Sequence, residues 1–187
     1  ISDCLVGSEM CIRDSDNVAV GYIAMNNASG AENVAVGSRA LQDMTTGDHN
    51  VAVGHHALHS QTQQSNNTAV GQEAGYSNLT GDSVAAFGYR ALYANTTGPR
   101  NTAIGLQALS SNTTGQHNTA VGFNCLNSNT TGPSNVAMGY QTMNANVGGY
   151  SNTAIGFRSL MTNQTGGNST AIGCLLYTSD AADDDHC

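Results

Sequence analysis

The chain repeats one short motif ten times, and this repetition constrains its fold more than any other feature of the sequence. The motif reads Asn-x-Ala-x-Gly, and its glycines are separated by 16 residues once and by 17 residues from Gly37 onward. The repeated glycines are Gly21, Gly37, Gly54, Gly71, Gly88, Gly105, Gly122, Gly139, Gly156 and Gly173. An alanine lies two residues before each glycine, and these alanines are Ala19, Ala35, Ala52, Ala69, Ala86, Ala103, Ala120, Ala137, Ala154 and Ala171. We therefore interpret residues 16–173 as one repeat domain.

Other positions of the unit keep their residue type at the same spacing. Asn lies four residues before the glycine in eight copies, and the two exceptions are Val84 and Ser169. Leu or Met lies four residues after the glycine in most copies, as at Leu109 and Met143. Several units close on Thr-Thr-Gly, at residues 45–47, 96–98, 113–115 and 130–132. Constant length and constant residue types indicate one structural unit stacked many times.

The two ends of the chain do not share the repeat. Residues 1–15 and 174–187 hold four of the five cysteines, which are Cys4, Cys11, Cys174 and Cys187. The strings CLVGSEMCIRDS and CLLYTSDAAD resemble sequencing-library adapter that has been translated by mistake. We interpret both ends as non-native flanks and the chain as a fragment. A native N-terminal cap and a native acidic tail are the alternative.

Charge is low once the flanks are set aside. The formal net charge of −8 divides into −2 for residues 1–15, −4 for residues 174–187 and −2 for the repeats. The chain has no lysine, and phosphate binding requires clustered cations, so we expect no nucleic-acid partner. No stretch approaches the roughly 18 apolar residues of a membrane span, so we expect no membrane insertion of this fragment. Cys125 is alone within the repeats and leaves the redox compartment undecided.

The motif alternates in a way that is typical of a short β-strand. Thr or Val precedes the alanine and a larger aliphatic residue follows it, as at Thr102 and Ile104. These side chains would point to one face of the strand and the alanine to the other. The unit is too short for two helices and rich in Asn, Gly and Thr, which are weak in helix interiors. For the next segment, such as residues 106–111, we favour a second short strand over a single helical turn, and Ser-Asn-Thr-Thr-Gly predicts a turn.

Stacked copies of this unit predict an all-β fold, a parallel β-solenoid or β-roll of about ten coils spaced about 4.8 Å apart. Each residue would then lie above its equivalent in the preceding coil, and Asn side chains at equivalent positions could hydrogen-bond in a ladder. Alanine at one position in every copy indicates a site without room for a larger side chain. That site is the narrow interior of the coil or a close contact with another chain, unless the alanine merely spread by duplication.

A slim coil has little interior, and this favours assembly of several chains. Each coil offers few large apolar side chains to offset the backbone entropy lost when it is ordered. Packing several solenoids around a common axis would bury a second face of every coil. We therefore expect a homo-oligomer.

Over residues 16–173 the motif resembles the repeats of two related groups of proteins. The Asn-[Thr/Val]-Ala-[Val/Ile]-Gly core followed by x-x-Ala-Leu resembles the head repeats of trimeric autotransporter adhesins, which form left-handed parallel β-rolls assembled as trimers. The 17-residue unit with Ser-Asn-Thr-Thr-Gly between cores is more similar still to repeats of phage tail-fibre proteins and related bacterial surface proteins. The resemblance implies a left-handed β-roll and a homotrimer. The adhesin repeat is shorter, so the coil geometry of this chain departs from it.

No set of residues in the repeats has the pattern of a catalytic, cofactor or metal site, so we expect neither an enzyme nor a cofactor. His55, His56 and His59 are the densest titratable cluster. His55 and His59 would share a face only on a helix, and we favour a solvated edge over a metal site. Three aspartates lie in predicted turns, and we interpret their side chains as solvated: Asp43, Asp48 and Asp82.

An aromatic residue follows the motif glycine in half of the copies. In a stack these residues would form a column along the rod. The column would contact a glycan or protein receptor, or it would seal the corner of the coil or a contact between chains, and the sealing role is the interpretation that we favour. The candidate receptor-facing residues are Tyr22, Tyr89, Phe123, Tyr140 and Phe157.

Together these features predict a structural and adhesive protein, a rigid trimeric fibre or head segment that attaches to a host cell or surface. We favour a phage tail fibre, on the virion tail, and the alternative is the head of a bacterial trimeric autotransporter adhesin, on the cell surface. The expected partners are further copies of the chain and a glycan or protein receptor on the host. An ice-binding β-solenoid is a third interpretation, because stacked threonines form a regular array, although valines share their row.

Overall fold

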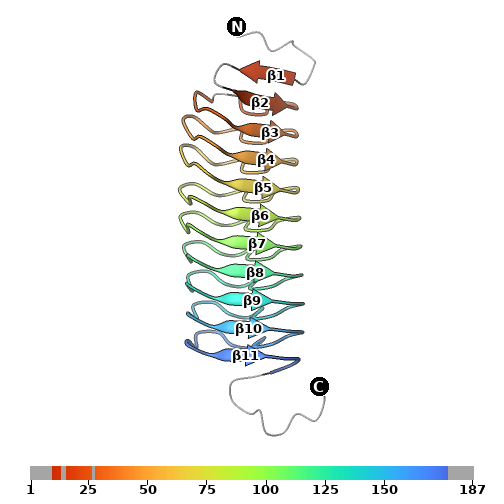
Figure 1. Cartoon of the computed structure of the whole chain (residues 1–187), viewed down its shortest axis with the longest axis vertical. Coiled ribbons are helices and arrows are strands. Elements are labelled where there is room, and N and C mark those ends of the chain that lie inside the picture. Colours follow the sequence, from red (N-terminus) through yellow and green to blue (C-terminus); the bar gives the residue numbers. More distant parts are fainter. Residues whose placement is uncertain (1–9, 14–15, 27, 177–187) are drawn as a thin grey trace.

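The computed structural model describes residues 10–13, 16–26 and 28–176, and the repeats form a rod of stacked coils (Figure 1). Eleven strands make one sheet in chain order, and β2 to β11 run parallel to one another. Neighbouring strands pair in the repeat register, so that Ala103 lies between Ala86 and Ala120. The fold is therefore an all-β parallel β-solenoid of about nine turns of about 17 residues, with no helix among the described residues, and the predicted fold class is confirmed.

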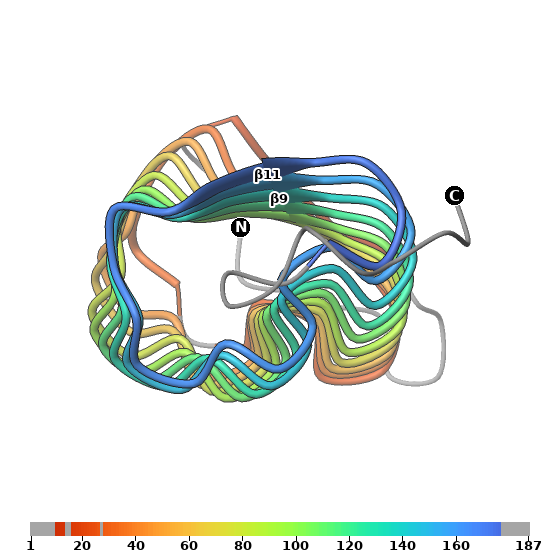
Figure 2. The same cartoon turned by 90° about the horizontal axis from the view of Figure 1, so that it is seen from below.

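The strands are short and nearly equal in length. They are β1 (Met10–Arg13), β2 (Asn17–Val20), β3 (Val34–Val36), β4 (Val51–Val53), β5 (Thr68–Val70), β6 (Ala85–Phe87), β7 (Thr102–Ile104), β8 (Thr119–Val121), β9 (Val136–Met138), β10 (Thr153–Ile155) and β11 (Thr170–Ile172). Viewed along the rod, they form one side of the coil, and the turns curve round the remaining sides (Figure 2).

Each repeat strand points its alanine inward and the two flanking side chains outward. The motif alanines range from 0% to 7% exposed, whereas Ile104 is 42% exposed. The alternation read from the sequence is confirmed. Of the two sites considered for the alanine, the structure selects the narrow interior of the coil.

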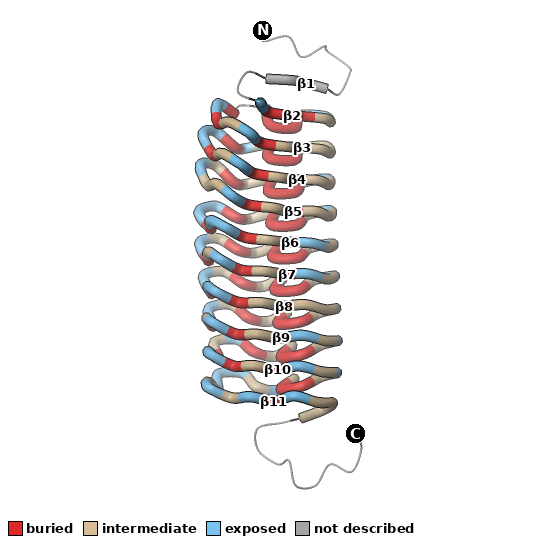
Figure 3. Tube along the Cα trace, viewed as in Figure 1, coloured by how far each residue is buried: buried red, intermediate tan, exposed pale blue. Residues whose placement is uncertain are grey.

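Columns of equivalent side chains fill the interior, and the buried segments recur at the same places in successive coils (Figure 3). The residue four positions after the motif glycine forms the main apolar column. The residue before it is small, usually alanine, and is buried as well; Cys125 takes this place in one coil. The large buried side chains of the column are Met25, Leu41, Leu58, Leu92, Leu109, Leu126, Met143 and Leu160.

The second strand expected at residues 106–111 is wrong, because the structure has a series of tight turns there. Gln107 and Leu109 have φ angles of +55° and +51°, in the left-handed region. This curl buries the adjacent residues Ala108 and Leu109 together, which the alternating faces of a strand would not allow. Equivalent positive φ angles recur in the other coils.

The predicted Asn ladder is present and runs inside the rod. The side-chain oxygen of Asn101 accepts a hydrogen bond from the backbone N–H of Asn118, at 2.9 Å, and that of Asn118 accepts one from Asn135, also at 2.9 Å. The side-chain amide of Asn118 donates to the carbonyl oxygen of Gly132 at 2.9 Å. The buried Asn side chains form these hydrogen bonds only when equivalent residues lie one above another. The ladder therefore stabilises one register of stacking over the others.

A second buried ladder comes from the Asn of the Asn-Thr-Thr-Gly turn. The side-chain amide of Asn112 donates to Asn95 Oδ1 at 2.8 Å, and that of Asn129 donates to Asn112 Oδ1 at 2.9 Å. Asn112 also donates to the carbonyl oxygen of Gly115 in its own turn, at 2.9 Å. The sequence predicted the turn but gave no sign that its Asn is an interior residue.

The first strand lies in the N-terminal flank. β1 pairs antiparallel with β2, with Met10 opposite Val20 and Arg13 opposite Asn17. The rest of that flank and residues 177–187 of the other flank lie outside the described residues, so the interpretation of the flanks stays a prediction. Within the described ranges, no helix has the length and apolar character needed to cross a membrane.

Successive coils approach closely at the motif glycines. Gly88 has a φ of +129°, and a Cβ at this position would lie 2.7 Å from the carbonyl oxygen of Gly105. Such a separation is shorter than any ordinary contact, and side chains rarely adopt this φ. At Gly148, in a turn, a Cβ would lie 3.5 Å from Thr131 Oγ1, which is an ordinary contact.

We expect Gly88→Ala to lower the free energy of unfolding by at least about 2 kcal/mol, because it adds backbone strain and a clash between coils. Gly148→Ala is the matched control and should change this free energy by less than about 0.5 kcal/mol. Urea unfolding followed by circular dichroism measures both. Equal effects of the two substitutions would contradict the close approach at the motif glycine.

Candidate functional site

Two outward rows of side chains run along the sheet face, one on each side of the buried alanines. The first row consists of Val18, Val34, Val51, Thr68, Ala85, Thr102, Thr119, Val136, Thr153 and Thr170. The second row consists of Val20, Val36, Val53, Val70, Phe87, Ile104, Val121, Met138, Ile155 and Ile172. None of the twenty side chains carries a charge, so the face is a continuous apolar and hydroxyl-bearing surface as long as the repeat domain.

The side chains of the second row become larger toward the C-terminal half of the rod. The second row holds only valine as far as Val70, and from β6 onward it holds larger side chains except at Val121. Phe87, Ile104 and Met138 are 38%, 42% and 42% exposed. Large side chains that gather on one exposed face are typical of an interaction surface.

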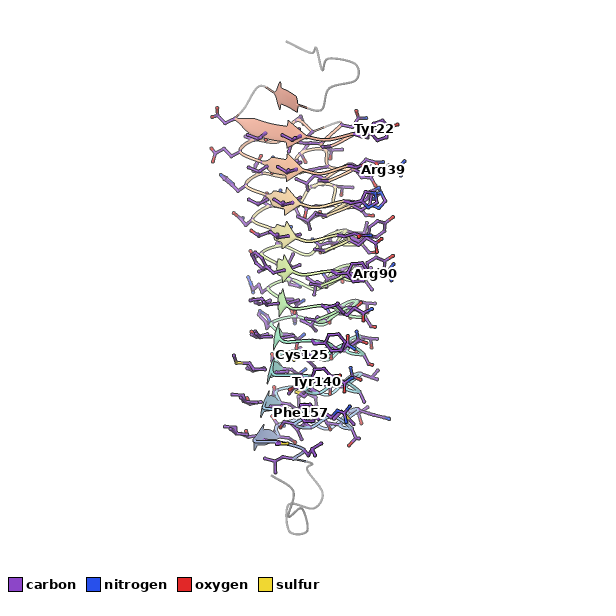
Figure 4. The ribbon with its side chains drawn as sticks, turned by 90° about the vertical axis from the view of Figure 1, so that its right-hand side faces the viewer. Tyr22, Arg39, Arg90, Cys125, Tyr140 and Phe157 are labelled. Carbon is purple, nitrogen blue, oxygen red and sulfur yellow. The ribbon has the colours of Figure 1, made fainter. Side chains whose placement is uncertain are left out.

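An aromatic ladder lies beside this face in the coils near the C-terminal end. Phe123, Tyr140 and Phe157 follow the motif glycines of three successive coils and stack in parallel. The ring centroids are 5.2 Å apart for Phe123 and Tyr140, and 5.3 Å apart for Tyr140 and Phe157. The guanidinium carbon of Arg158 lies 5.2 Å from the centroid of Phe157. Figure 4 shows Tyr140 and Phe157 one below the other along the rod.

Stacking within the ladder limits what it can bind. Both faces of the Tyr140 ring are covered, by Phe123 on one side and Phe157 on the other. A sugar that stacks on an aromatic face therefore has no access to Tyr140. The ring edges and the Tyr140 hydroxyl remain, and the quadrupole makes these edges electropositive. This geometry favours the sealing role for these three residues, and the receptor-facing role stays a prediction.

The other two candidate residues lie apart from the ladder. Tyr22 is near the N-terminal end of the rod (Figure 4). It is 64% exposed, and Tyr89 is 38% exposed. The guanidinium carbon of Arg90 lies 5.2 Å from the Tyr89 ring and 5.1 Å from the Tyr93 ring. The predicted column is therefore divided, because Ser38, His55, Gln72 and Leu106 occupy its intervening positions.

The structure brings the three histidines of coil 50–66 together without a helix. The ring centroids of His55 and His56 are 3.9 Å apart, and those of His56 and His59 are 5.0 Å apart. His56 contacts both other rings, and positive φ angles at His56 and Leu58 tighten the turn between them. The expectation that His55 and His59 themselves would share a face only on a helix stays a prediction. Only His55 is exposed, so the cluster is a partly buried corner rather than a solvated edge.

Protonation is disfavoured at the centre of this cluster. Burial, and then the neighbouring His55, His59 and Arg39 in that order, hold the pKa of His56 below its ordinary value of 6.5. Its Nε2 is buried and has no hydrogen-bond partner. No group of three or more His, Cys, Asp or Glu side chains within the described part of the chain could hold a metal ion.

The aspartates predicted to be solvated in the turns have partners in the neighbouring coils. Asp48 Oδ1 accepts a hydrogen bond from the backbone N–H of Ala31 at 2.7 Å, and Asp82 Oδ1 accepts one from that of Ser65 at 3.3 Å. Asp43 lies 3.6 Å from Nδ1 of His59. These carboxylates link successive coils, while Asp43 and Asp82 are exposed as expected and Asp48 is half-buried.

Comparison with known proteins does not identify this chain. No protein-family model matches it, and neither a curated protein sequence nor a solved structure is significantly similar to it. Its function is therefore argued from its own surfaces.

The reactivity of the Cys125 thiol tests whether the interior of the rod is closed to solvent. Burial raises the pKa of this thiol to about 12, and the thiol donates to the carbonyl oxygen of Ala137 at 3.1 Å. Since only the thiolate is a nucleophile, we expect iodoacetamide to leave Cys125 unlabelled in the folded chain near pH 8 and to label it in the urea-unfolded chain. Peptide mass spectrometry distinguishes this cysteine from the others. Equal labelling of both states would contradict a closed interior.

Proposed function

We propose that this chain is a structural and adhesive repeat protein without catalytic activity or a cofactor. It forms a rigid segment of a homotrimeric fibre or head that attaches to a host cell or surface. The observation that carries the proposal is the pair of uncharged outward rows along the whole sheet face. Exposed sheet faces that stay solvated normally alternate polar and charged side chains, and this face does not.

A second copy of the same chain is the partner that fits this face best. The rows repeat once per coil, so a partner contacts every coil equivalently only if it has the same spacing between coils. Only another copy is certain to have that spacing. The larger side chains from Phe87 to Ile155 would then meet their equivalents in a parallel assembly. Three copies around one axis is the number suggested by the resemblance to adhesin heads.

Attachment would use the surfaces that self-assembly leaves exposed. The exposed aromatic residues, Tyr22 at 64% and Tyr89 at 38%, are the candidates that the ladder leaves free to contact a host glycan or protein. A phage tail fibre on the virion is the favoured parent, and the head of a bacterial trimeric autotransporter adhesin on the cell surface is the alternative. The motif is common to both parents.

Ice binding is a second candidate from a different class, and the first outward row supports it. Thr102 and Thr119 are adjacent in this row and lie on a sheet of parallel strands with one spacing. Regular hydroxyl and methyl groups on such a face could order water. Val136 and Ala85 interrupt the hydroxyls in the same row.

Analytical ultracentrifugation tests the assembly. We expect the chain to sediment as a trimer, and the double variant Ile104→Lys with Ile155→Lys to lose the trimer, because charges buried without partners are strongly unfavourable. Thr97→Lys, on an exposed turn, is the matched control and should stay trimeric. A wild-type chain that sediments as a folded monomer would sink the proposal.

Thermal hysteresis of the same sample separates the two functional classes. The fibre proposal predicts no hysteresis. A measurable hysteresis that is lost in Thr119→Lys would favour ice binding instead.

A further inference from the structure

Coils 50–66 and 67–83 are the least regular part of the interior. Gly75 replaces the leucine of the main apolar column, and a Cβ at this position would lie 2.8 Å from Leu58 Cδ2. Leu58 therefore occupies the space that the missing side chain leaves. In the next coil Val84 replaces the ladder Asn. Asn67 Oδ1 still accepts a hydrogen bond from the backbone N–H of Val84, at 2.9 Å, but Val84 has no side-chain amide to continue the ladder. These coils receive less support from inside than their neighbours do.

A run of rings joins the same coils on the outside of the rod. His59 stacks on Tyr76 of the next coil, with centroids 5.0 Å apart and planes 14° apart. Tyr76 in turn stacks on Tyr93 of the following coil, at 5.3 Å. His56 meets both His59 and Tyr76, at 5.0 Å and 5.7 Å. The external packing of these coils therefore depends on imidazole rings.

The charged groups around the cluster come from the coils on both sides. Arg39 and Asp43 belong to the preceding coil, and Glu73 belongs to the following coil. Arg39 and Arg90 project from the same edge of the rod, at different heights (Figure 4). Asp43 lies 3.6 Å from His59 Nδ1 and can balance a charge there.

The carboxylate on the other side is less available. Glu73 accepts a hydrogen bond from Arg90 at 2.6 Å, so it is already paired. If His59 is protonated and balanced by Asp43, a second positive charge on His56 would lie about 5 Å from it and beside Arg39. No unpaired carboxylate among the groups named here would balance that second charge.

We propose that His55, His56 and His59 form an acid-sensitive switch in the rod. At neutral pH the rings of His56 and His59 pack on Tyr76 and join coils 50–66 and 67–83, and in mild acid protonation of His56 beside His55, His59 and Arg39 opens this corner. Coils further along the rod, in residues 101–151, stay stacked, because their apolar column and Asn ladders are complete. The rod would then bend or open at one predetermined place.

The direction of the pH dependence follows from the cluster itself. The pKa of His56 lies below its ordinary value of 6.5 in the folded chain, chiefly because of burial. The folded state therefore binds fewer protons than the opened state, and acid favours opening. The packing is fully stabilising above about pH 6.5 and weakens as the pH falls below that value.

Hydrogen–deuterium exchange of the full chain tests the switch, with rates corrected for the chemical dependence of exchange on pH. Between about pH 7.5 and about pH 5 we expect protection of residues 50–83 to fall several-fold. Residues 101–151 should change far less. A loss of protection spread evenly along the rod, or none at all, would overturn the proposal.

The repeat itself supplies conservative substitutions for each histidine. Gln72, Gln107 and Asn127 occupy the equivalent positions in other coils, so the triple variant His55→Gln, His56→Gln and His59→Asn replaces each ring by a side chain that its column accepts. This variant should lose the acid-dependent exchange. His117→Ser, which copies Ser134 of the next coil, is the matched control and should keep it. Acid-dependent exchange that persists in the triple variant would assign the effect to other groups.

Discussion

The register between neighbouring coils is the constraint on which the rest of this structure depends. Each coil is joined to the next by backbone hydrogen bonds, such as that from Thr119 N–H to the Asn135 carbonyl oxygen at 2.8 Å. The side-chain oxygens of the buried Asn118 and Asn129 accept hydrogen bonds across the same junction, from Asn135 and Asn146. A buried amide without a partner is costly, so a coil shifted by one residue would lose many interactions at once. The same residue types must therefore return at the same position in every coil.

This constraint explains how much of the fold the sequence could reveal. Ala103, Gly105 and Asn101 were readable as interior or junction residues because stacking demands one residue type at each of these positions. The turn at Gln107 and Leu109 was not readable. Left-handed φ angles normally select Gly or Asn, and here the stacked coils impose them on ordinary side chains. Asn-Thr-Thr-Gly has the composition of an exposed turn, so the interior role of Asn112 was hidden as well.

The surfaces follow the same logic, and they were harder to predict. Stacking converts a single outward residue into a row along the rod, which makes a face out of Ile104 and its equivalents. The contacts among His55, His56 and His59 are different, because they arise within one coil from the path of a turn that the sequence does not encode in its periodicity. The regular coils of a repeat array thus present the same side chains again and again along one face. A property that belongs to one coil alone, such as the histidine cluster, arises where the repeat is irregular.

Distances between exposed positions of the turn row test the stacking most directly. Three coils have an exposed residue at the same turn position: Gln63, Thr131 and Thr165. Thr131 lies four coils from Gln63, and Thr165 lies six coils from it. Spin labels at these sites, diluted with unlabelled chain, should give electron–electron distances of about 19 Å for the Gln63–Thr131 pair and about 29 Å for the Gln63–Thr165 pair. Distances that fail to grow in proportion to the number of intervening coils would contradict coils stacked in register.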